Sequence, residues 1–330
     1  MTLFSLPSDP IVSVILPVRN GGRFFARAVE SVLSQTFSSF ELLVVDDGST
    51  DRSDSIAIDK ARADSRIVIL RNERRGIAHA LNTGLKAARG RYIGRMDADD
   101  ISHPARLERQ ITFLEAHPDC VAVGAGVDVI DAEDETVGFI AYPPRHPEIV
   151  DALMTGATPA LAHPAMVMRK DAVLAAGAYR HEEVPCEDLG LWFRLIDVGA
   201  VANLEERLLR YRMHPGSTSL SDSSHQRAAT LAIRGAARAR RGLAPLHAEP
   251  WHAYAHRNAA AGFHYECVRT ALTSRNRSAV FKHARAGIRL DPRWWRPYAA
   301  LALSALPQRG IALLMNAYIR LRNPARASTR

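Results

Sequence analysis

The first hundred residues alternate between two kinds of hydrophobic pattern. Short runs of apolar and β-branched residues predict buried strands, and each run stops at a polar or Gly-containing turn. Between the runs, apolar residues recur at spacings of three and four, as in Phe25, Ala28 and Val29, which predicts helices. The predicted strands are 11–16, 41–45, 67–70 and 91–96, and the predicted helices are 24–35, 53–63 and 76–88. Strands that alternate with helices in this way predict a largely parallel sheet with right-handed crossovers.

The alternation is less regular from residue 104 to residue 211. Pro104 is expected in the first turn of a helix that runs to residue 117. Further helices are predicted at 149–154, 171–176 and 188–198, and further strands at 121–129, 165–168 and 207–211. Strand patterns then stop, and an Ala- and Arg-rich region predicts helices alone. We therefore expect two domains, an α/β domain at 1–223 and a helical region at 224–330.

Charge divides the chain at nearly the same point. From His225 onward, 19 Lys and Arg stand against 3 Asp and Glu, whereas the preceding residues carry 24 against 32. The basic region fits an anionic membrane surface or an anionic acceptor, since each base near anionic lipid adds about 1 kcal/mol; a solvated helical appendix is the alternative. Few interleaved aromatic residues and no nucleic-acid-binding motif accompany the bases, so we expect no nucleic-acid partner.

Composition and cysteine use point to the cytoplasm. Hydrophobic residues make up 47% of the chain and charged residues 24%, as in ordinary globular proteins. The N-terminal segment lacks the features of a signal peptide, and no apolar run reaches the length of a membrane span. Three scattered cysteines, Cys120, Cys186 and Cys267, suit a reducing compartment. We expect a cytoplasmic protein whose basic helices contact the inner face of the cytoplasmic membrane.

Polar side chains gather after three of the predicted strands, at 17–20, 46–49 and 97–100. Open α/β sheets bind ligands beyond the carboxyl ends of their strands. Neither GxGxxG nor GxxxxGK[ST] is present, so dinucleotide and P-loop sites lose their usual support. Clustered carboxylates repel one another, and Mg²⁺ or Mn²⁺ bridging them to a diphosphate would compensate the charge. Alternatively, Asp99 or Asp100 caps the helix that follows.

Longer motifs occur in a characteristic order. They are VSVILP at 12–17, SVLSQT at 31–36, VVDDGSTD at 44–51, GIAHALNTG at 76–84, YIGRMDADDIS at 92–102, EDLGLW at 187–192 and YRMH at 211–214. This series, over roughly residues 10–220, resembles the inverting family-2 glycosyltransferases of bacterial cell-surface polysaccharide synthesis. The resemblance implies a GT-A fold, with a Rossmann-like, mainly parallel sheet and flanking helices. It also implies transfer of a sugar from a UDP, GDP or TDP sugar to a glycan or lipid-linked hydroxyl.

The resemblance implies a donor site and a metal site. The residues expected to bind the nucleotide sugar are Pro17, Val18, Asn20, Asp46, Asp47, Asp97 and Ala98. Among them, Asp47 would pair with the nucleotide base. Mn²⁺ or Mg²⁺ would be held by Asp97, Asp99 and His214, with Asp99 as the more direct ligand. A histidine before proline is also common in plain loops, so a structural role for His214 is the alternative.

A sugar hydroxyl is a poor nucleophile, so a positioned carboxylate must take its proton. The resemblance assigns this role to Asp188, with Glu187 as the alternative, and places His163 and Trp192 on the acceptor side. The Gln-x-x-Arg-Trp motif of the related processive synthases is absent, which favours addition of one sugar per encounter. Two other functions fit an acidic α/β site: a nucleotidyltransferase and a catalytically silent nucleotide-sugar-binding protein.

Overall fold

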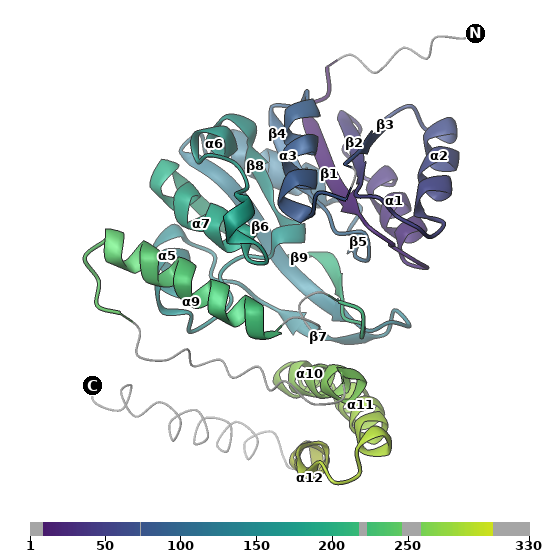
Figure 1. Ribbon diagram of the computed structural model, residues 1–330. Helices are drawn as coiled ribbons and strands as arrows, with labels where there is room; N and C mark the ends of the chain where they lie inside the picture. The colour runs from purple at the N-terminus through teal and green to yellow at the C-terminus, as the bar shows by residue number, and fades with distance from the viewer. Residues whose placement is uncertain (1–8, 73, 218–222, 246–258, 306–330) are drawn as a thin grey trace. The chain divides into compact units, whose positions relative to one another are not determined.

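A computed structural model describes residues 9–72, 74–217, 223–245 and 259–305 (Figure 1). Contacts divide the chain into two compact units. The first comprises Met1–Asp128, Ile140–Arg212 and His225–Leu246, and the second comprises Val129–Phe139, Met213–Ser224 and His247–Arg330. In the described part of the chain, no helix is both long and apolar enough to cross a membrane.

The strands form one sheet, in the order β3-β2-β1-β4-β8-β6-β9-β5, with β7 paired to β6. The strands are β1 (Val12–Val18), β2 (Phe40–Asp46), β3 (Ile67–Arg71), β4 (Tyr92–Arg95), β5 (Ile101–Ser102), β6 (Cys120–Ile130), β7 (Thr136–Ile140), β8 (Val167–Arg169) and β9 (Ala200–Arg212). β1 pairs in parallel with β2 and β4, and β2 pairs in parallel with β3. β8 is antiparallel to both β4 and β6. The parallel sheet expected from the first hundred residues is confirmed, and its direction reverses between β4 and β8.

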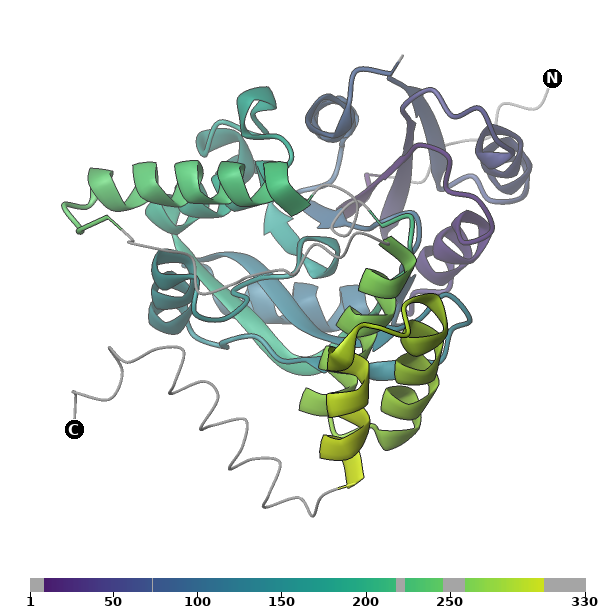
Figure 2. The ribbon, with the colours of Figure 1, turned by 60° about the horizontal axis from the view of Figure 1, so that its bottom comes forward.

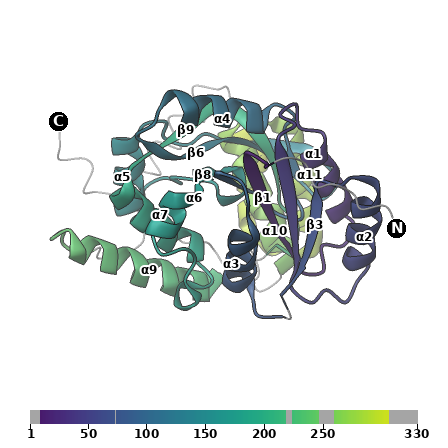
Figure 3. The ribbon, with the colours of Figure 1, turned by 90° about the horizontal axis from the view of Figure 1, so that it is seen from above.

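Helices cover both faces of this sheet in the first unit. They are α1 (Phe25–Leu33), α2 (Ser53–Ala63), α3 (Ile77–Ala87), α4 (Arg106–Ala116), α5 (His146–Thr155), α6 (Lys170–Ala175), α7 (Glu187–Val198) and α9 (Ser223–Arg240), with short 3₁₀ turns η1 (His163–Ala165) and η2 (His181–Glu183). Figure 3 shows the sheet between α1 and α4 on one side and α3, α6, α7 and α9 on the other. Strand residues alternate between the two faces: Ile15 and Leu43 belong to the same buried cluster as α3, α5 and α7. The α/β sandwich expected from the sequence is confirmed.

Three strands differ from the sequence expectation, and one of them, the two-residue strand β5, was not predicted. β9 begins at Ala200, seven residues before the predicted start, because its first half is only partly buried and lacks an apolar run. β7 was not predicted, and two of its five residues are buried. Short half-exposed strands carry too little hydrophobic contrast for a pattern to reveal them.

The helix α9 belongs by contacts to the first unit, although the sequence analysis places the domain boundary at residue 223. Arg234 Nε donates to the carbonyl of Leu153 at 2.8 Å, and Arg238 Nη1 donates to that of Met154 at 2.9 Å. The functional division at 223 stays a prediction. The contacts attach the beginning of the basic region to the α/β unit.

The second unit contains α10 (Ala259–Thr273), α11 (Arg277–Leu290) and α12 (Trp295–Ala305). Figure 2 shows these three helices side by side, in green to yellow. Asn276 caps α11 by accepting from the amide of Ala279 at 3.1 Å, and its Nδ2 donates to the carbonyl of Thr136 at 2.7 Å. The Asn276 side chain thus caps the first turn of α11 and also holds the 129–139 hairpin against this helix.

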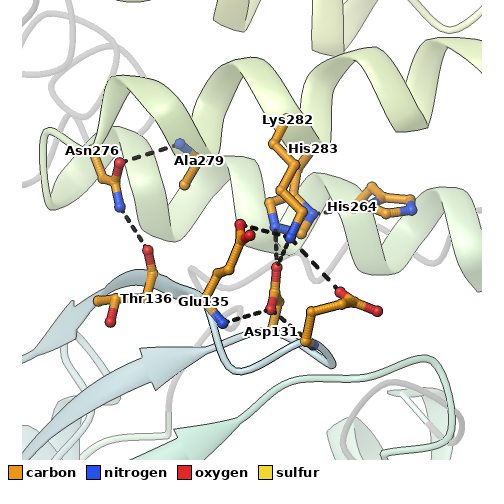
Figure 4. Close-up of polar contacts among 9 residues, drawn as sticks. Asp131, Glu135, Thr136, His264, Asn276, Ala279, Lys282 and His283 are labelled. Atoms are coloured by element: carbon orange, nitrogen blue, oxygen red, sulfur yellow. Dashed lines mark hydrogen bonds and ion pairs between the residues drawn. The ribbon is translucent and has the colours of Figure 1, made fainter.

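Asp131 is the buried polar centre of the second unit (Figure 4). Its Oδ1 accepts from the amides of Glu133 and Glu135, both at 3.0 Å, and its Oδ2 pairs with Lys282 and, at 3.3 Å, with His283 Nε2. His283 Nδ1 lies 2.9 Å from Nδ1 of His264, so one ring donates and the other accepts. Burial and the neighbouring His264 lower the pKa of His283 to about 4, against the opposite effect of Asp131.

We expect the second unit to lose stability between pH 6.5 and pH 4. The pKa of His283 is lower in the folded chain than in the unfolded chain, so the unfolded state binds the additional proton in that range. The loss should be on the order of 1–3 kcal/mol. Hydrogen exchange of α10 and α11 amides, corrected for intrinsic rates, measures it in the full chain.

His283→Asn should flatten this pH dependence, whereas His181→Asn, at an exposed position of η2, should leave it unchanged. An equal pH dependence in wild type and His283→Asn would show that His283 is not the titrating group.

Candidate active site

Three carboxyl groups converge directly after β4. Oxygen atoms of Asp97, Asp99 and Asp100 lie within 4.8 Å of one another, and Asp100 is fully buried. Because β4 runs parallel to β1, with Arg95 opposite Ile15, the cluster shares an edge of the sheet with the loop after β1. The structure therefore brings the predicted metal residues Asp97 and Asp99 together and adds Asp100.

Arg95 is the nearest counter-charge of this cluster. Its Nη2 donates to Asp97 Oδ1 at 2.6 Å, and the side chain is only 4% exposed. No described residue accepts a hydrogen bond from its Nε or Nη1. Burial raises the pKa of Asp97, Arg95 opposes this shift, and the charge of Asp99 adds to it. One guanidinium thus compensates the cluster only in part.

Asp100 shows the charge imbalance most clearly. Its Oδ1 accepts from the amide of Arg212 at 2.7 Å, and its buried Oδ2 has no hydrogen-bond partner among the described residues. Burial, with the charges of Asp99 and Asp97, raises its pKa well above the usual range. The capping alternative has no support here, because Asp100 bonds to β9 and the N-cap of α4, Ala105, has no side-chain cap bond.

An orphaned buried oxygen among clustered carboxylates fits a hard divalent cation, which prefers oxygen ligands. Mg²⁺ and Mn²⁺ both suit such a donor set. The residues present could therefore hold the expected metal.

Two further arginines position the acidic loop. Arg212 Nε donates to the carbonyl of Asp99 at 2.7 Å, and its guanidinium lies 4.5 Å from the ring centre of Phe24. Arg106 is fully buried and donates to the carbonyls of Arg95 at 2.9 Å and Pro164 at 2.6 Å. Strands β4 and β9 and turn η1 are thereby joined around the cluster.

The predicted base-binding residue Asp47 lies between the ends of β1 and β3. Its amide donates to the carbonyl of Val18 at 2.8 Å, and its Oδ1 accepts from Asn72 at 2.6 Å. The amide of Gly76 approaches both carboxylate oxygens at 3.1–3.2 Å. Asp47 is buried, with 5% of the residue exposed, and the loop before α3 already holds its carboxylate.

Asn20 and Asp46 connect the loops after β1 and β2. The amide of Asn20 donates to Ser49 Oγ at 3.0 Å, and its Oδ1 accepts from the amide of Thr50 at 2.7 Å. Asp46 Oδ1 accepts from the amide of Ser49 at 3.0 Å. Of the remaining predicted donor residues, Pro17 lies in β1 opposite Val45, and Ala98 is half-buried between the acids. The loops after β1 and β2 thus form one hydrogen-bonded rim.

The two candidate bases open helix α7. Asp188 lines a cavity of about 330 Å³ together with Trp192, whereas Glu187 does not line it. Burial and the charge of Asp188 raise the pKa of Glu187 to about 7, and its buried Oε2 has no hydrogen-bond partner among the described residues. Burial also raises the pKa of Asp188, although the amide of Leu189 opposes the shift. The cavity supports Asp188 over Glu187.

The two predicted histidines lie in different surroundings. His163 is buried, its Nε2 lies 2.9 Å from Tyr179 Oη, and its ring is edge-on to Trp192 with centres 5.6 Å apart. Burial and the charge of Arg95 lower its pKa well below the usual value, which favours the neutral imidazole. His214 belongs to the second unit, where its Nδ1 accepts from the amide of Gly216 at 3.2 Å. Its expected metal role stays a prediction.

Comparison with known proteins identifies the family. The model of "Glycosyl transferase family 2" matches residues 13–174. The putative glycosyltransferase EpsE of Bacillus subtilis is 37% identical over 210 residues, 62% of this chain and 74% of that protein. The O-antigen biosynthesis glycosyltransferase WbnJ of Escherichia coli is 31% identical over 232 residues, 68% and 88% of the two chains. The chain belongs to glycosyltransferase family 2.

Solved structures agree with this assignment at the level of the fold. S. aureus TarS 1–349 in complex with UDP-GlcNAc has a TM-score of 0.56 at 20% identity, covering 96% of this chain and 87% of that fragment. The mannosyltransferase PcManGT of Pyrobaculum calidifontis, in complex with GDP-Man and Mn²⁺, has a TM-score of 0.53 at 22% identity, with coverage of 97% and 83%. The GT-A fold expected for this glycosyltransferase is confirmed.

Sequence reasoning missed several residues of the glycosyltransferase site. Asp100 was counted in the acidic cluster, with helix capping as the alternative, but was not named among the metal ligands, and Arg106 and Arg212 were not singled out. Arginines in helices and strands are normally exposed, and only a fully buried one, such as Arg106, signals a structural task. No local sequence pattern distinguishes buried from exposed arginines, because the hydrogen-bond partners of Arg106 and Arg212 lie 11 to 113 residues away in the chain.

Asp100→Asn should increase the free energy of unfolding of the metal-free enzyme at neutral pH, because the amide removes a buried, repelled charge. The folded pKa of Asp100 lies above its unfolded value, so wild-type stability falls as pH rises between the two. The amide cannot ionise and still accepts from the amide of Arg212. Urea denaturation in a chelator, from pH 4 to pH 8, measures the difference.

Asp119→Asn, at an exposed turn position, is the control and should follow wild type. A steeper pH dependence in Asp100→Asn than in wild type would contradict the raised pKa.

Proposed function

We propose that this family 2 glycosyltransferase is metal-dependent and inverting. It moves a sugar from a nucleoside-diphosphate sugar to a hydroxyl acceptor, in the synthesis of a surface polysaccharide or glycolipid. The observation that carries the proposal is the cluster of Asp97, Asp99 and Asp100 at the carboxyl edge of β4, in the same unit as the loops after β1 and β2. The relatives named for O-antigen synthesis and for complexes with UDP-GlcNAc and GDP-Man support the substrate classes.

Asp97, Asp99 and Asp100 would hold the cation, and Mn²⁺ or Mg²⁺ fits their oxygen donors. When bound, such a cation neutralises charge that develops on a leaving diphosphate. Arg95 keeps Asp97 oriented through its 2.6 Å hydrogen bond. Arg212 holds the backbone at Asp99. These two contacts keep the ligands in place, so little rearrangement is needed when the donor binds.

The loops after β1 and β2 supply the donor-nucleotide site. Asp47 remains the residue expected to pair with the base, and Asn72 and Gly76 hold its carboxylate in one orientation. Asn20 and Asp46 shape the rim through their bonds to the 49–50 turn. UDP, GDP and TDP sugars are the candidate donors.

Asp188 acts as the general base in the proposed reaction. It takes the proton of the acceptor hydroxyl while the oxygen bonds to the anomeric carbon and the bond from that carbon to the diphosphate breaks. One displacement inverts the anomeric configuration and needs no second carboxylate for a covalent intermediate. Family membership favours this sugar transfer over nucleotidyl transfer, which would release pyrophosphate instead of a nucleoside diphosphate.

Asp99→Asn should lower sugar transfer by about 100-fold or more, because a neutral amide is a weaker ligand for a divalent cation. Mn²⁺ titration should show weaker binding in the same variant. Nucleoside diphosphate released from UDP, GDP and TDP sugars measures activity, and pyrophosphate release tests nucleotidyl transfer. Wild-type activity in Asp99→Asn would refute the metal assignment, and no binding of any donor to wild type would favour a silent protein.

Asp188→Asn should lower transfer by about 10²–10⁴-fold, with little change in donor KM, because an amide cannot accept the proton. Glu187→Gln is the matched control, with an expected loss below about tenfold. The pH profile of sugar transfer by Glu187→Gln should also lack the titration near pH 7 that Glu187 contributes in the wild type, since the pKa of Glu187 is about 7. A larger loss in Glu187→Gln than in Asp188→Asn would reverse the two roles.

The expected contact between the basic C-terminal region and anionic lipid also belongs to this proposal. It is supported by the 19 Lys and Arg that follow His225. A cytoplasmic enzyme with such a region would meet lipid-linked acceptors at the membrane surface.

A further inference from the structure

The cavity beside Asp188 is lined in part by residues that lie outside the family motifs. Its volume is about 330 Å³, at the lower end of the range for small-molecule sites. Asp188 and Trp192 of α7 line it on one side, and Gln226, Thr230 and Arg234 of α9 line it on another. The helix α9 follows the last motif and begins the basic region.

α9 is held directly against the start of α7. Cys186, the N-cap of α7, places its Sγ 3.5 Å from the carbonyl of Gln226 and 3.4 Å from Thr230 Oγ1. Asp188 follows two residues later. The contact of Cys186 with Gln226 and Thr230 therefore sets the distance between Asp188 and the side chains of α9.

α9 is also attached to the end of α5. Arg234 and Arg238 donate to the carbonyls of Leu153 and Met154, which belong to the last turn of that helix. Such carbonyls lack partners within the helix and carry partial negative charge, so guanidinium donors are favoured there. A Cβ at Gly156, where φ is +65°, would lie 2.6 Å from Arg234 Nη1. A side chain at position 156 would therefore displace the Arg234 guanidinium from this place beside α5.

The lining of the cavity has the character of a sugar site. Trp192 and several aliphatic residues supply apolar surface, and Gln226 and Thr230 supply an amide and a hydroxyl. Binding sites for small ligands typically combine apolar walls with a few orienting polar groups. Arg234 and Asp188 bring one basic and one acidic side chain to the lining, so their charges balance and an uncharged ligand fits the cavity.

We propose that this cavity binds the terminal, uncharged pyranose ring of the acceptor, and that Gln226 and Thr230 of α9 determine which sugar is accepted. The inference rests on the proposed role of Asp188, because the ring would present one hydroxyl to that carboxylate. The proton passes from this hydroxyl to Asp188 as the new glycosidic bond forms. α9 thereby connects the basic region to acceptor choice.

The first test measures binding alone. Saturation-transfer NMR of the full chain with a panel of methyl pyranosides of the common hexoses and N-acetylhexosamines should detect at least one ligand. Thr230→Tyr fills the cavity and should abolish that signal. Leu231→Tyr adds the same ring at the neighbouring position, which is 43% exposed and outside the cavity, and should preserve it.

Thr230→Val is the conservative variant at the first position, and Gln226→Ala removes the amide at the second. Each single variant should weaken pyranoside binding about 5–30-fold, the effect of one lost hydrogen bond. Both variants should keep wild-type donor KM and wild-type hydrolysis of the nucleotide sugar without acceptor.

The proposal is overturned if no pyranoside binds the wild type, or if Thr230→Tyr binds as the wild type does. Failure of the proposed function has a different signature. In that case the donor is neither bound nor hydrolysed by the wild type, whatever the pyranoside result.

Discussion

The desolvated charge at the carboxyl end of β4 is the constraint around which the catalytic unit is organised. Three carboxyl groups share a small volume there, one of them buried and two half-buried, which makes their mutual repulsion costly. Arg95 compensates one of them directly, while Arg106 and Arg212 hold the backbone on either side. The remaining imbalance is what a cation bound with a diphosphate would remove. A site of this kind would be most stable with such a cation bound.

In the proposed reaction, the same unit assigns the donor and acceptor tasks to different elements. The loops after β1 and β2 hold Asp46 and Asp47 through hydrogen bonds from backbone amides. The proposed acceptor side instead uses the cavity lined by α7 and by α9, a helix beyond the family motifs. With this arrangement, substitutions in α9 would change the acceptor without altering the loops after β1 and β2. In the second unit, Asp131 performs an analogous organising task by joining a hairpin to α11.

The parts of the fold that sequence patterns predicted are those whose signal is local. A continuous apolar run such as 41–45 predicts a strand that is buried on both faces, as β2 is. The acids after β4 could be proposed as ligands because parallel strands present their carboxyl ends at one edge. The missed strands β5 and β7 are short or half-exposed, and their hydrophobic contrast is correspondingly weak. The start of β9 was misplaced for the same reason.

The sequence by itself determined the α/β architecture, the family and the residue types of the site, since these follow from periodicity and from ordered motifs. Only the tertiary structure decided which carboxylates are desolvated and which side chain faces a cavity. Asp188 and Glu187 are neighbours with similar chemistry, and the rotation of α7 alone places Asp188 on the cavity wall. Nothing in the local sequence marks Gln226 and Thr230, which line the cavity because α9 packs against α5 and α7. Burial and long-range contact are properties of the folded chain, and no local pattern contains them.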